Sequence, residues 1–430
     1  MKIVVVGGGS TYTPELVDGF ARLRDTLAVD ELVLVDPDAE RLGLVAGVSA
    51  RILAKQGHPG RLVSGTELDE HLDGAAAVLL QLRVGGQAAR HTDETVPLMC
   101  GCVGQETTGA GGLAKALRTV PVVLDIADRI RKRAPEAWIV DFTNPVGIVT
   151  RALLDAGHKA VGLCNVAKGF QHRFGEYFDV DAEQVQLDHV GLNHLTWERG
   201  VRIDGVDVLP QLLAEHGEEL AARVQIPIEV MRRHGVIPSY YLRFFYAHDA
   251  VVAEQLGQES RAEQVAELER ELLAMYADPG LDVKPALLGK RGGAYYSEAA
   301  IGLVAGLLGE GGDGGDGGGG DGGTVQVANV RNGDTMPFLS ADAVIEVPCR
   351  VDATGVHPLP IAPVDPLQAG LIAHVAAYEE LALRAAIHGG AGRVEDALIA
   401  HPLIGQTEPA QKLAAELISV NRRYLPWAAS

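Results

Sequence analysis

A glycine-rich stretch near the amino terminus has the composition of a nucleotide-binding turn. Three glycines at 7–9 follow the apolar run Ile3–Val6, and Pro14 suits the first turn of a helix. Backbone N–H groups at the start of such a helix can approach a pyrophosphate because glycine has no Cβ in the way. Tyr12 stands where the Gly-x-Gly-x-x-Gly pattern has its third glycine, so the turn indicates a dinucleotide site without matching that pattern.

Asp36 strengthens this interpretation because it ends the next apolar run, Leu32–Val35. An acidic residue at that place accepts hydrogen bonds from the adenosine ribose of NAD and repels the 2′-phosphate of NADP. The alternative is that the glycines only make a tight turn and that Asp36 caps the following segment. We favour NAD binding, and the candidate residues are Gly7, Gly8, Gly9, Ser10, Thr11 and Asp36.

Cys164 and His194 are candidates for metal binding. Cys164 ends a predicted strand, and His194 follows in a Gly-Leu-Asn-His run. On spacing alone the pair is weak, since a lone buried cysteine is usually a small apolar residue and a lone histidine is usually hydrogen-bonded in the core or on the surface.

Strand-like and helical runs alternate over about the first 165 residues. The further strand-like runs are Ala77–Leu82, Trp138–Phe142 and Ala160–Cys164, and helical spacing covers Arg41–Lys55 and Leu113–Lys132. This alternation predicts an α/β fold with a Rossmann-type doubly wound parallel sheet in residues 1–165, which binds ligands outside the carboxyl ends of its strands.

The pattern of residues 166–430 differs and predicts a second, α+β domain that closes over the first. Strand-like runs occur between Val185 and Val208, and helical spacing covers Leu212–Arg223, Ala262–Tyr276, Ser297–Leu308, Leu367–Ile387 and Gln411–Asn421. Residues 311–323 are almost only Gly and Asp, which predicts a flexible surface loop rather than a calcium site, because no rigid frame fixes the carboxylates.

Composition excludes several classes of function. The 430 residues carry 37 Lys plus Arg against 57 Asp plus Glu, a formal charge of −20, which disfavours nucleic acids and anionic membranes as partners. The apolar runs are too short to span a bilayer, and Gly7 interrupts the first one before a signal-peptide core could form. We therefore expect a cytoplasmic protein whose four cysteines are thiols.

Motifs along residues 1–350 together resemble glycoside hydrolase family 4, whose members are NAD- and metal-dependent glycosidases, and most closely its 6-phospho-β-glucosidase branch. The matching segments are Gly8–Glu15, Arg83–Gly86, Gly104–Gly109, Thr143–Gly147, Gly162–Val166, Gly191–His194, Ile237–Leu242 and Arg291–Tyr296. Single motifs of this kind recur by chance, but eight in this order do not.

The resemblance implies an oxidation that is used to cleave a glycoside. In this family NAD takes hydride from C3 of the sugar, a base removes the C2 proton, and the group on C1 is eliminated. Water then adds and the hydride returns, so NAD is a catalytic cofactor and the net reaction is hydrolysis. A divalent cation such as Mn²⁺ acts as Lewis acid at the C3 oxygen.

The resemblance also implies roles for single residues. Cys164 and His194 match the metal ligands, with His189 as a competing candidate, and Tyr241 matches the base, with Tyr240 as the alternative. A free tyrosine titrates near 10, so a neighbouring cation would have to lower the pKa of the base.

Four further residues match substrate contacts. Asn144 and Arg90 look like the residues that hold sugar hydroxyls, and Arg261 matches the arginine that binds the 6-phosphate. Asn165 after the cysteine is similar to the β-specific branch. The chain departs from that branch at Ala167-Lys168, where members usually have Pro-Ile, and Glu106 has no assigned role.

The leading hypothesis is therefore an NAD- and Mn²⁺-dependent 6-phospho-β-glucosidase that forms a homodimer or homotetramer. One alternative is another specificity of the same family, on unphosphorylated or α-linked glycosides. Others are a lactate- or malate-type NAD dehydrogenase, whose two-domain architecture the predicted fold resembles, and a non-catalytic NAD-binding sensor.

Overall fold

The computed structural model of the chain describes residues 1–293, 295–309 and 323–428. The predicted loop at 311–323 lies outside the described residues except for Gly323. Among the helices in these ranges, none combines the length and the apolar character needed to cross a membrane.

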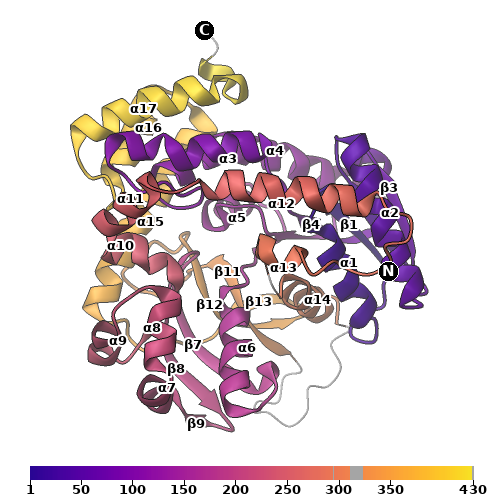
Figure 1. The fold of residues 1–430 in the computed structure, drawn as a ribbon, viewed down its shortest axis with the longest axis horizontal. Helices are drawn as coiled ribbons and strands as arrows, with labels where there is room; N and C mark the ends of the chain where they lie inside the picture. Colours follow the sequence, from indigo (N-terminus) through magenta and orange to yellow (C-terminus); the bar gives the residue numbers. More distant parts are fainter. Residues whose placement is uncertain (294, 310–322, 429–430) are drawn as a thin grey trace.

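A nine-stranded sheet forms the centre of the protein, in the order β13-β12-β11-β6-β5-β4-β1-β2-β3 (Figure 1). Strands β1 to β6 are parallel, and β11 to β13 are antiparallel. Their bounds are β1 Lys2–Val6, β2 Glu31–Val35, β3 Arg61–Gly65, β4 Ala75–Leu80, β5 Trp138–Asp141, β6 Ala160–Gly162, β11 Thr324–Arg331, β12 Val344–Asp352 and β13 Gly355–Pro358. The predicted α/β class with a doubly wound parallel sheet is confirmed.

Helices from both parts of the chain pack beside this sheet. Helix α1 (Thr13–Arg22) lies against α2 (Ala39–Lys55) and α14 (Tyr296–Leu307). Helix α4 (Gly109–Arg133) lies against α5 (Val146–Asp155) and α15 (Pro366–His388). The central strands are accordingly buried on both faces, which explains why their sequences are continuous apolar runs.

A smaller antiparallel sheet carries part of the candidate site. It contains β7 (Val185–Leu192), β8 (Leu195–Ile203), β9 (Val206–Asp207) and β10 (Ile237–Pro238). Strands β7 and β8 form a hairpin in which Leu192 pairs with Leu195, so the loop is Asn193-His194, and His194 has φ 62°. This geometry fixes the histidine at the tip of a rigid hairpin.

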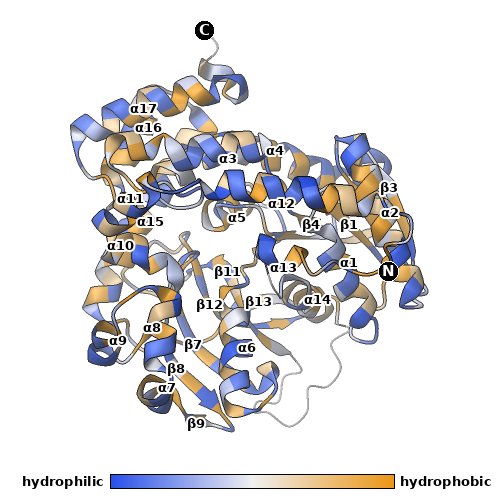
Figure 2. Ribbon diagram, viewed as in Figure 1, coloured by the Kyte–Doolittle hydropathy of each residue, from blue (hydrophilic) through white to orange (hydrophobic). Residues whose placement is uncertain are grey.

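The remaining helices surround these sheets. They are α3 Gly86–Thr95, α6 Val166–Phe178, α7 Leu209–Glu215, α8 Gly217–Val224, α9 Ile228–His234, α10 Arg243–Tyr246, α11 His248–Leu256, α12 Arg261–Tyr276, α13 Leu288–Arg291, α16 Ala391–Ala400 and α17 Thr407–Asn421. In Figure 2 the outer helices α12 and α17 alternate hydrophilic and hydrophobic residues around their circumference. The helix predicted over 212–223 is two helices, α7 and α8, which meet at His216.

The predicted boundary at residue 165 falls directly after the parallel strands. The second part of the chain nevertheless contributes β11, β12 and β13 to the same sheet, with β11 next to β6. Because β6 leads to Cys164 and β12 carries Glu346, this junction joins residues from both parts of the chain at one place.

Candidate active site

The glycine turn, residues 7–11, packs closely between strands. The N–H groups of Gly7 and Gly8 both donate to the carbonyl oxygen of Val35 at 2.9 Å. Gly7 has φ +86°, and a Cβ there would lie 2.7 Å from the carbonyl oxygen of Gln81. A Cβ at Gly8 would lie 2.8 Å from Cβ of Leu34. Packing alone therefore requires these two glycines, whatever the turn binds.

Asp36 lies directly beside the glycine turn. Its carboxylate accepts hydrogen bonds from the N–H of Gly9 and the N–H of Asp38, both at 3.0 Å. Arg41, which sequence reasoning missed, donates from Nε to the carbonyl oxygen of Gly9 at 2.7 Å. The sequence-predicted residues Gly9 and Asp36 thus meet, and a cation lies next to them.

Helix α12 covers the glycine turn from the second part of the chain (Figure 1). Thr11 is fully buried, and its hydroxyl lies 3.4 Å from Oε1 of Glu269. The Tyr276 hydroxyl donates to the carbonyl oxygen of Thr11 at 2.6 Å. Glu269 also binds Arg41 and Arg291. No sequence signal identified Glu269, because it is one of several acidic residues on a helix.

Ser10 makes a local contact within the turn. Its hydroxyl accepts a hydrogen bond from the N–H of Tyr12 at 3.3 Å, just before α1 begins at Thr13. Ser10 therefore helps to shape the start of the helix.

Cys164 lies between β6 and α6, with hydrogen-bond donors around its sulfur. The N–H groups of Val166 and Asn165 and the side chain of Asn193 hydrogen-bond to it and favour the thiolate. Burial nevertheless dominates and, together with the charge of Glu346, raises the pKa of the thiol well above its usual value. These donors suit a thiolate whose charge a nearby cation neutralises.

The rings of His194 and Tyr241 are stacked, and Cys164 lies near enough to Tyr241 for its charge to act on the tyrosine. Their ring centroids are 3.7 Å apart at an interplanar angle of 6°. Burial raises the pKa of Tyr241 well above its usual value, and the charge of Cys164 adds to this effect, whereas Arg90 opposes it. The structure therefore brings together three residues that are far apart in sequence. We refer to Cys164, His194 and Tyr241 as the cysteine–histidine cluster.

The hydrogen bonds of Thr107 assign the tautomer of His194. The Oε1 atom of Gln105 lies 3.1 Å from the N–H of Thr108 and is also approached by the N–H of Thr107, so it is an acceptor. It lies 2.8 Å from the Thr107 hydroxyl, which must therefore donate its hydrogen to it. The same hydroxyl lies 2.9 Å from Nδ1 of His194 and accepts from it. Nε2 of His194 is then left without a proton and can bind a metal.

His189, the competing candidate for a metal ligand, has another role. Nδ1 lies 2.6 Å from Glu198, and Nε2 lies 3.1 Å from Glu346, so both ring nitrogens contact carboxylates. Although burial acts against the charged form, the two carboxylates raise the pKa of His189 to about 10. Glu346 also accepts a hydrogen bond from Asn193 at 2.8 Å, and Asn193 reaches the sulfur of Cys164. His189 therefore stabilises the network under the cluster and offers a metal no free nitrogen.

Glu106 gathers three cations near the cluster. Arg83 forms an ion pair with it, and it lies 2.7 Å from Nζ of Lys115 and 3.3 Å from Nε of Arg90. Burial opposes ionisation, but these charges hold the pKa of Glu106 well below its usual range. Arg90, whose charge acts on Tyr241, is held between Glu106 and Glu94, and its Nε donates to Glu94 at 2.7 Å.

The two other predicted substrate residues, Asn144 and Arg261, differ in their hydrogen bonding. Asn144 Oδ1 is buried and has no hydrogen-bond partner within the described part of the chain. Arg261 donates to the carbonyl oxygen of Lys290 at 2.8 Å. Burial, followed by the positive charge of Arg90, lowers the pKa of Arg261. The carboxylate of Glu94, which accepts a hydrogen bond from Arg90 at 2.7 Å, opposes this effect.

The structure also places Tyr240, the alternative to Tyr241, and Lys168, at the departure from the family pattern. Tyr240 is 41% exposed, and its hydroxyl accepts from Arg243 at 2.7 Å, whereas Tyr241 is in the cluster. Lys168 pairs with Glu183 at 3.0 Å. The departure at Ala167-Lys168 therefore leaves the lysine occupied by a surface carboxylate.

Family models match most of the chain. The description "Family 4 glycosyl hydrolase" covers residues 2–180, and "Family 4 glycosyl hydrolase C-terminal domain" covers residues 189–404. The chain belongs to the family 4 glycosyl hydrolases. This family 4 protein is therefore a glycosidase, as its motifs predicted.

Individual relatives agree with this assignment. A probable 6-phospho-beta-glucosidase of Bacillus subtilis (strain 168) is 36% identical, over 99% of this chain and 97% of its own. The 6-phospho-beta glucosidase of Thermotoga maritima, solved with manganese, NAD+ and glucose-6-phosphate, has a TM-score of 0.89 and 32% identity, and 99% of each chain is covered. Malate dehydrogenase from Salinibacter ruber has a TM-score of 0.54 at 15% identity, with 91% of this chain and 100% of that chain covered, which shows a shared fold only.

Proposed function

We propose that the protein hydrolyses 6-phospho-β-glucosides with NAD and a divalent cation such as Mn²⁺. The observation that carries this proposal is the convergence of Cys164, His194 and Tyr241 from three distant segments. Further support comes from the relatives, which are 6-phospho-beta-glucosidases by name and include a complex with manganese, NAD+ and glucose-6-phosphate.

The glycine turn and Asp36 are the proposed NAD site. The chemistry supplied by NAD when bound at these residues would be reversible hydride transfer. The three glycines leave N–H groups close to the start of α1 for the pyrophosphate, and Asp36 is held beside Gly9 for the ribose. Helix α12 would keep water away from this side through Glu269 and Tyr276.

Cys164 and Nε2 of His194 would hold the divalent cation, which supplies Lewis-acid stabilisation of charge at the substrate oxygens. The donor set fits, since three hydrogen bonds favour the thiolate and Thr107 leaves Nε2 unprotonated. No group of three or more His, Cys, Asp or Glu side chains within the described ranges could hold a metal by itself. The remaining ligands would then come from substrate and water.

Tyr241 is the proposed base that removes the C2 proton. Its stacking on His194 fixes the ring, and the charge of Arg90 favours the tyrosinate against burial. As the tyrosinate, Tyr241 would take the C2 proton at its phenolate oxygen while the electrons of that bond form the C1–C2 double bond and the bond from C1 to the leaving group breaks. The leaving oxygen takes a proton from water, and water then adds at C1. Tyr240 is held away by Arg243 and is not needed for this step.

The substrate residues are proposed on charge and hydrogen bonding. Arg261, whose guanidinium lies near that of Arg90, would bind the 6-phosphate. The unpartnered Oδ1 of Asn144 would accept from a sugar hydroxyl. Asn165 beside Cys164 supports the β-linked substrate through the resemblance to that branch of the family.

The domain roles follow the same division. We assign NAD binding to residues 1–165, and substrate binding, catalysis and oligomerisation to residues 166–430. A homodimer or homotetramer, a cytoplasmic location, and the absence of nucleic-acid or membrane partners stay predictions.

A panel of nitrophenyl glycosides tests the function. It compares α and β anomers, each with and without 6-phosphate, in the presence of NAD and Mn²⁺. We expect the 6-phospho-β-glucoside to be cleaved fastest, with no net NADH and with deuterium from D₂O at C2 of the product. Steady accumulation of NADH, or product without label at C2, would contradict the proposed reaction.

A further inference from the structure

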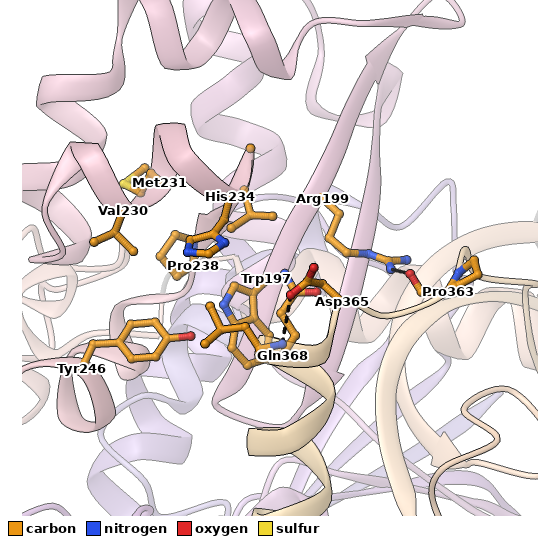
Figure 3. Close-up of a pocket in the computed structure, with 13 residues that line it drawn as sticks. Trp197, Arg199, Val230, Met231, His234, Pro238, Tyr246, Pro363, Asp365 and Gln368 are labelled. Atoms are coloured by element: carbon orange, nitrogen blue, oxygen red, sulfur yellow. Dashed lines mark hydrogen bonds between the residues drawn. The ribbon is translucent and has the colours of Figure 1, made fainter.

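A pocket outside the cysteine–histidine cluster lies between the small sheet, α9 and the start of α15 (Figure 3). Its volume is about 170 Å³. A buried water needs roughly 10–15 Å³ of such volume, so the pocket has room for about a dozen non-hydrogen atoms, which is the size of one hexose.

Two buried polar atoms of the pocket have no partner. Gln368 is 3% exposed, yet its Oε1 has no hydrogen-bond partner within the described ranges. The same holds for Nε of Arg199, whose side chain is 10% exposed. Both residues line the pocket. One atom needs a donor and the other needs an acceptor, and leaving such groups unpaired costs free energy.

The charge of Arg199 is already matched. Its guanidinium donates to Asp188 at 2.8 Å and to the carbonyl oxygen of Pro363 at 3.1 Å, the latter shown in Figure 3. Asp365 also lines the pocket and caps α15 by accepting from the N–H of Leu367 at 2.9 Å. Arg199 is therefore already paired, and the carboxylate of Asp365 would repel a phosphate, so a neutral ligand suits the pocket better.

The other walls are aromatic and aliphatic. Trp197 is 1% exposed and its indole is hydrogen-bonded to the hydroxyl of Tyr246, which leaves the two rings fixed. Val230 and Leu367 add apolar surface. Fixed rings beside a few unsatisfied polar atoms are typical of small-molecule sites.

We propose that this pocket binds one neutral, unphosphorylated monosaccharide. A sugar presents adjacent hydroxyls, each of which can donate to Gln368 Oε1 or accept from Arg199 Nε. The choice of glucose as the ligand rests on the proposed function, because hydrolysis of a 6-phosphorylated glucose disaccharide releases an unphosphorylated glucose.

The pocket lies against the segment that carries the proposed base. Pro238 and Tyr246 line it and stand on either side of Tyr241 in the chain. Trp197 is on β8, the strand that follows His194. A sugar bound here would contact both ends of the segment that presents Tyr241. The released product would therefore bind next to the segment that carries the proposed base.

Calorimetric titration of glucose into the full-length protein without NAD or Mn²⁺ tests the proposal. We expect saturable binding that an excess of glucose 6-phosphate leaves unchanged. Gln368→Met removes the acceptor at similar size and should weaken glucose binding about tenfold. Leu367→Trp should reduce the pocket and abolish binding. Ile387→Trp, at an equally exposed position on the same helix, is the matched control and should bind as the unaltered protein does.

The possible results are decisive. The proposal would be overturned if glucose showed no saturable binding, or if glucose 6-phosphate displaced it. It would also be overturned if Gln368→Met and Leu367→Trp bound glucose as tightly as the unaltered protein does. Unchanged melting temperatures of the variants establish that they are folded. Since hydrolysis is not measured, this test and the glycoside panel can fail independently.

Discussion

The glycine turn and the cysteine–histidine cluster are built in different ways. The turn is held mainly through its backbone, by the bonds from Gly7 and Gly8 to Val35 and by the bond from Tyr276 of helix α12 to the carbonyl oxygen of Thr11. The cluster is held by side chains from distant segments, with Thr107 on His194 and Asn193 on Cys164. Substitutions at the turn should therefore act mainly through stability and NAD, and those at the cluster through charge, metal affinity and chemistry.

Replacement of the proposed base should give the largest effect. Tyr241→Phe keeps the ring that stacks on His194 and removes the hydroxyl, so we expect kcat to fall by about 10²- to 10⁴-fold with little change in NAD binding. Exchange of deuterium into C2 should be lost in parallel.

The neighbouring tyrosine is the matched control for this prediction. Tyr240→Phe should stay within a few-fold of the unaltered enzyme, since Tyr240 is turned toward Arg243. The opposite ranking of the two variants would assign the base to Tyr240.

The network that supports the cluster should depend on pH through His189. The pKa of His189 is raised from 6.5 to about 10, so its ion pairs stabilise the fold fully below pH 6.5 and are lost as pH rises toward 10. Relative to His189→Gln, we expect the unaltered protein to show an additional decline in the free energy of unfolding over this range, as measured by urea titration.

A variant isolates this contribution. In His189→Gln the decline between pH 6.5 and 10 should be smaller, whatever the absolute stability. An unchanged pH slope would show that His189 is not the titrating group.

Two neighbouring glycines should separate packing from ligand contact. Gly7→Ala places a Cβ against backbone at positive φ and should cost about 1–3 kcal/mol of stability, measured by urea unfolding. Gly9→Ala meets the movable side chain of Asp36 instead and should cost less, while the apparent affinity for NAD falls. Equal losses of stability at both positions would remove this distinction.

An effect of similar size is expected at the hydrogen bond from Nδ1 of His194 to the Thr107 hydroxyl. Thr107→Val leaves Nδ1 of His194 without its acceptor and should weaken Mn²⁺ binding about 10- to 100-fold in calorimetry. Thr107→Ser keeps the hydroxyl and should restore affinity. If Val and Ser variants bind Mn²⁺ alike, Thr107 does not orient the imidazole.

The sequence predicted the buried parallel strands well because their apolar runs are continuous. It missed β3, an edge strand with partly exposed residues, and α3, whose residues are mostly polar. It also missed the antiparallel extension by β11 to β13, since the pairing of Asn329 with Gly162 joins segments that no local pattern relates.

The candidate site shows the same limit. Residues carried by motifs were identified, but their partners were not. Glu346 lies in an apolar strand, where a lone carboxylate signals a buried charge that needs a partner, yet only the fold reveals that this partner is His189. Gln105 and Thr107 lay within a recognised motif, and their function as a hydrogen-bond relay depends on a histidine far along the chain.

The pairing of β11 with β6 has a consequence for expressing parts of this enzyme. A gene divided between residues 180 and 189, where the two family matches are separated, would encode a first fragment in which β6 is an unpaired edge strand. Such an edge is a template for aggregation. The division would also separate Cys164 from the buried carboxylate of Glu346. The halves are therefore expected to reach the native state only when they are produced together, so that each completes the other as it folds.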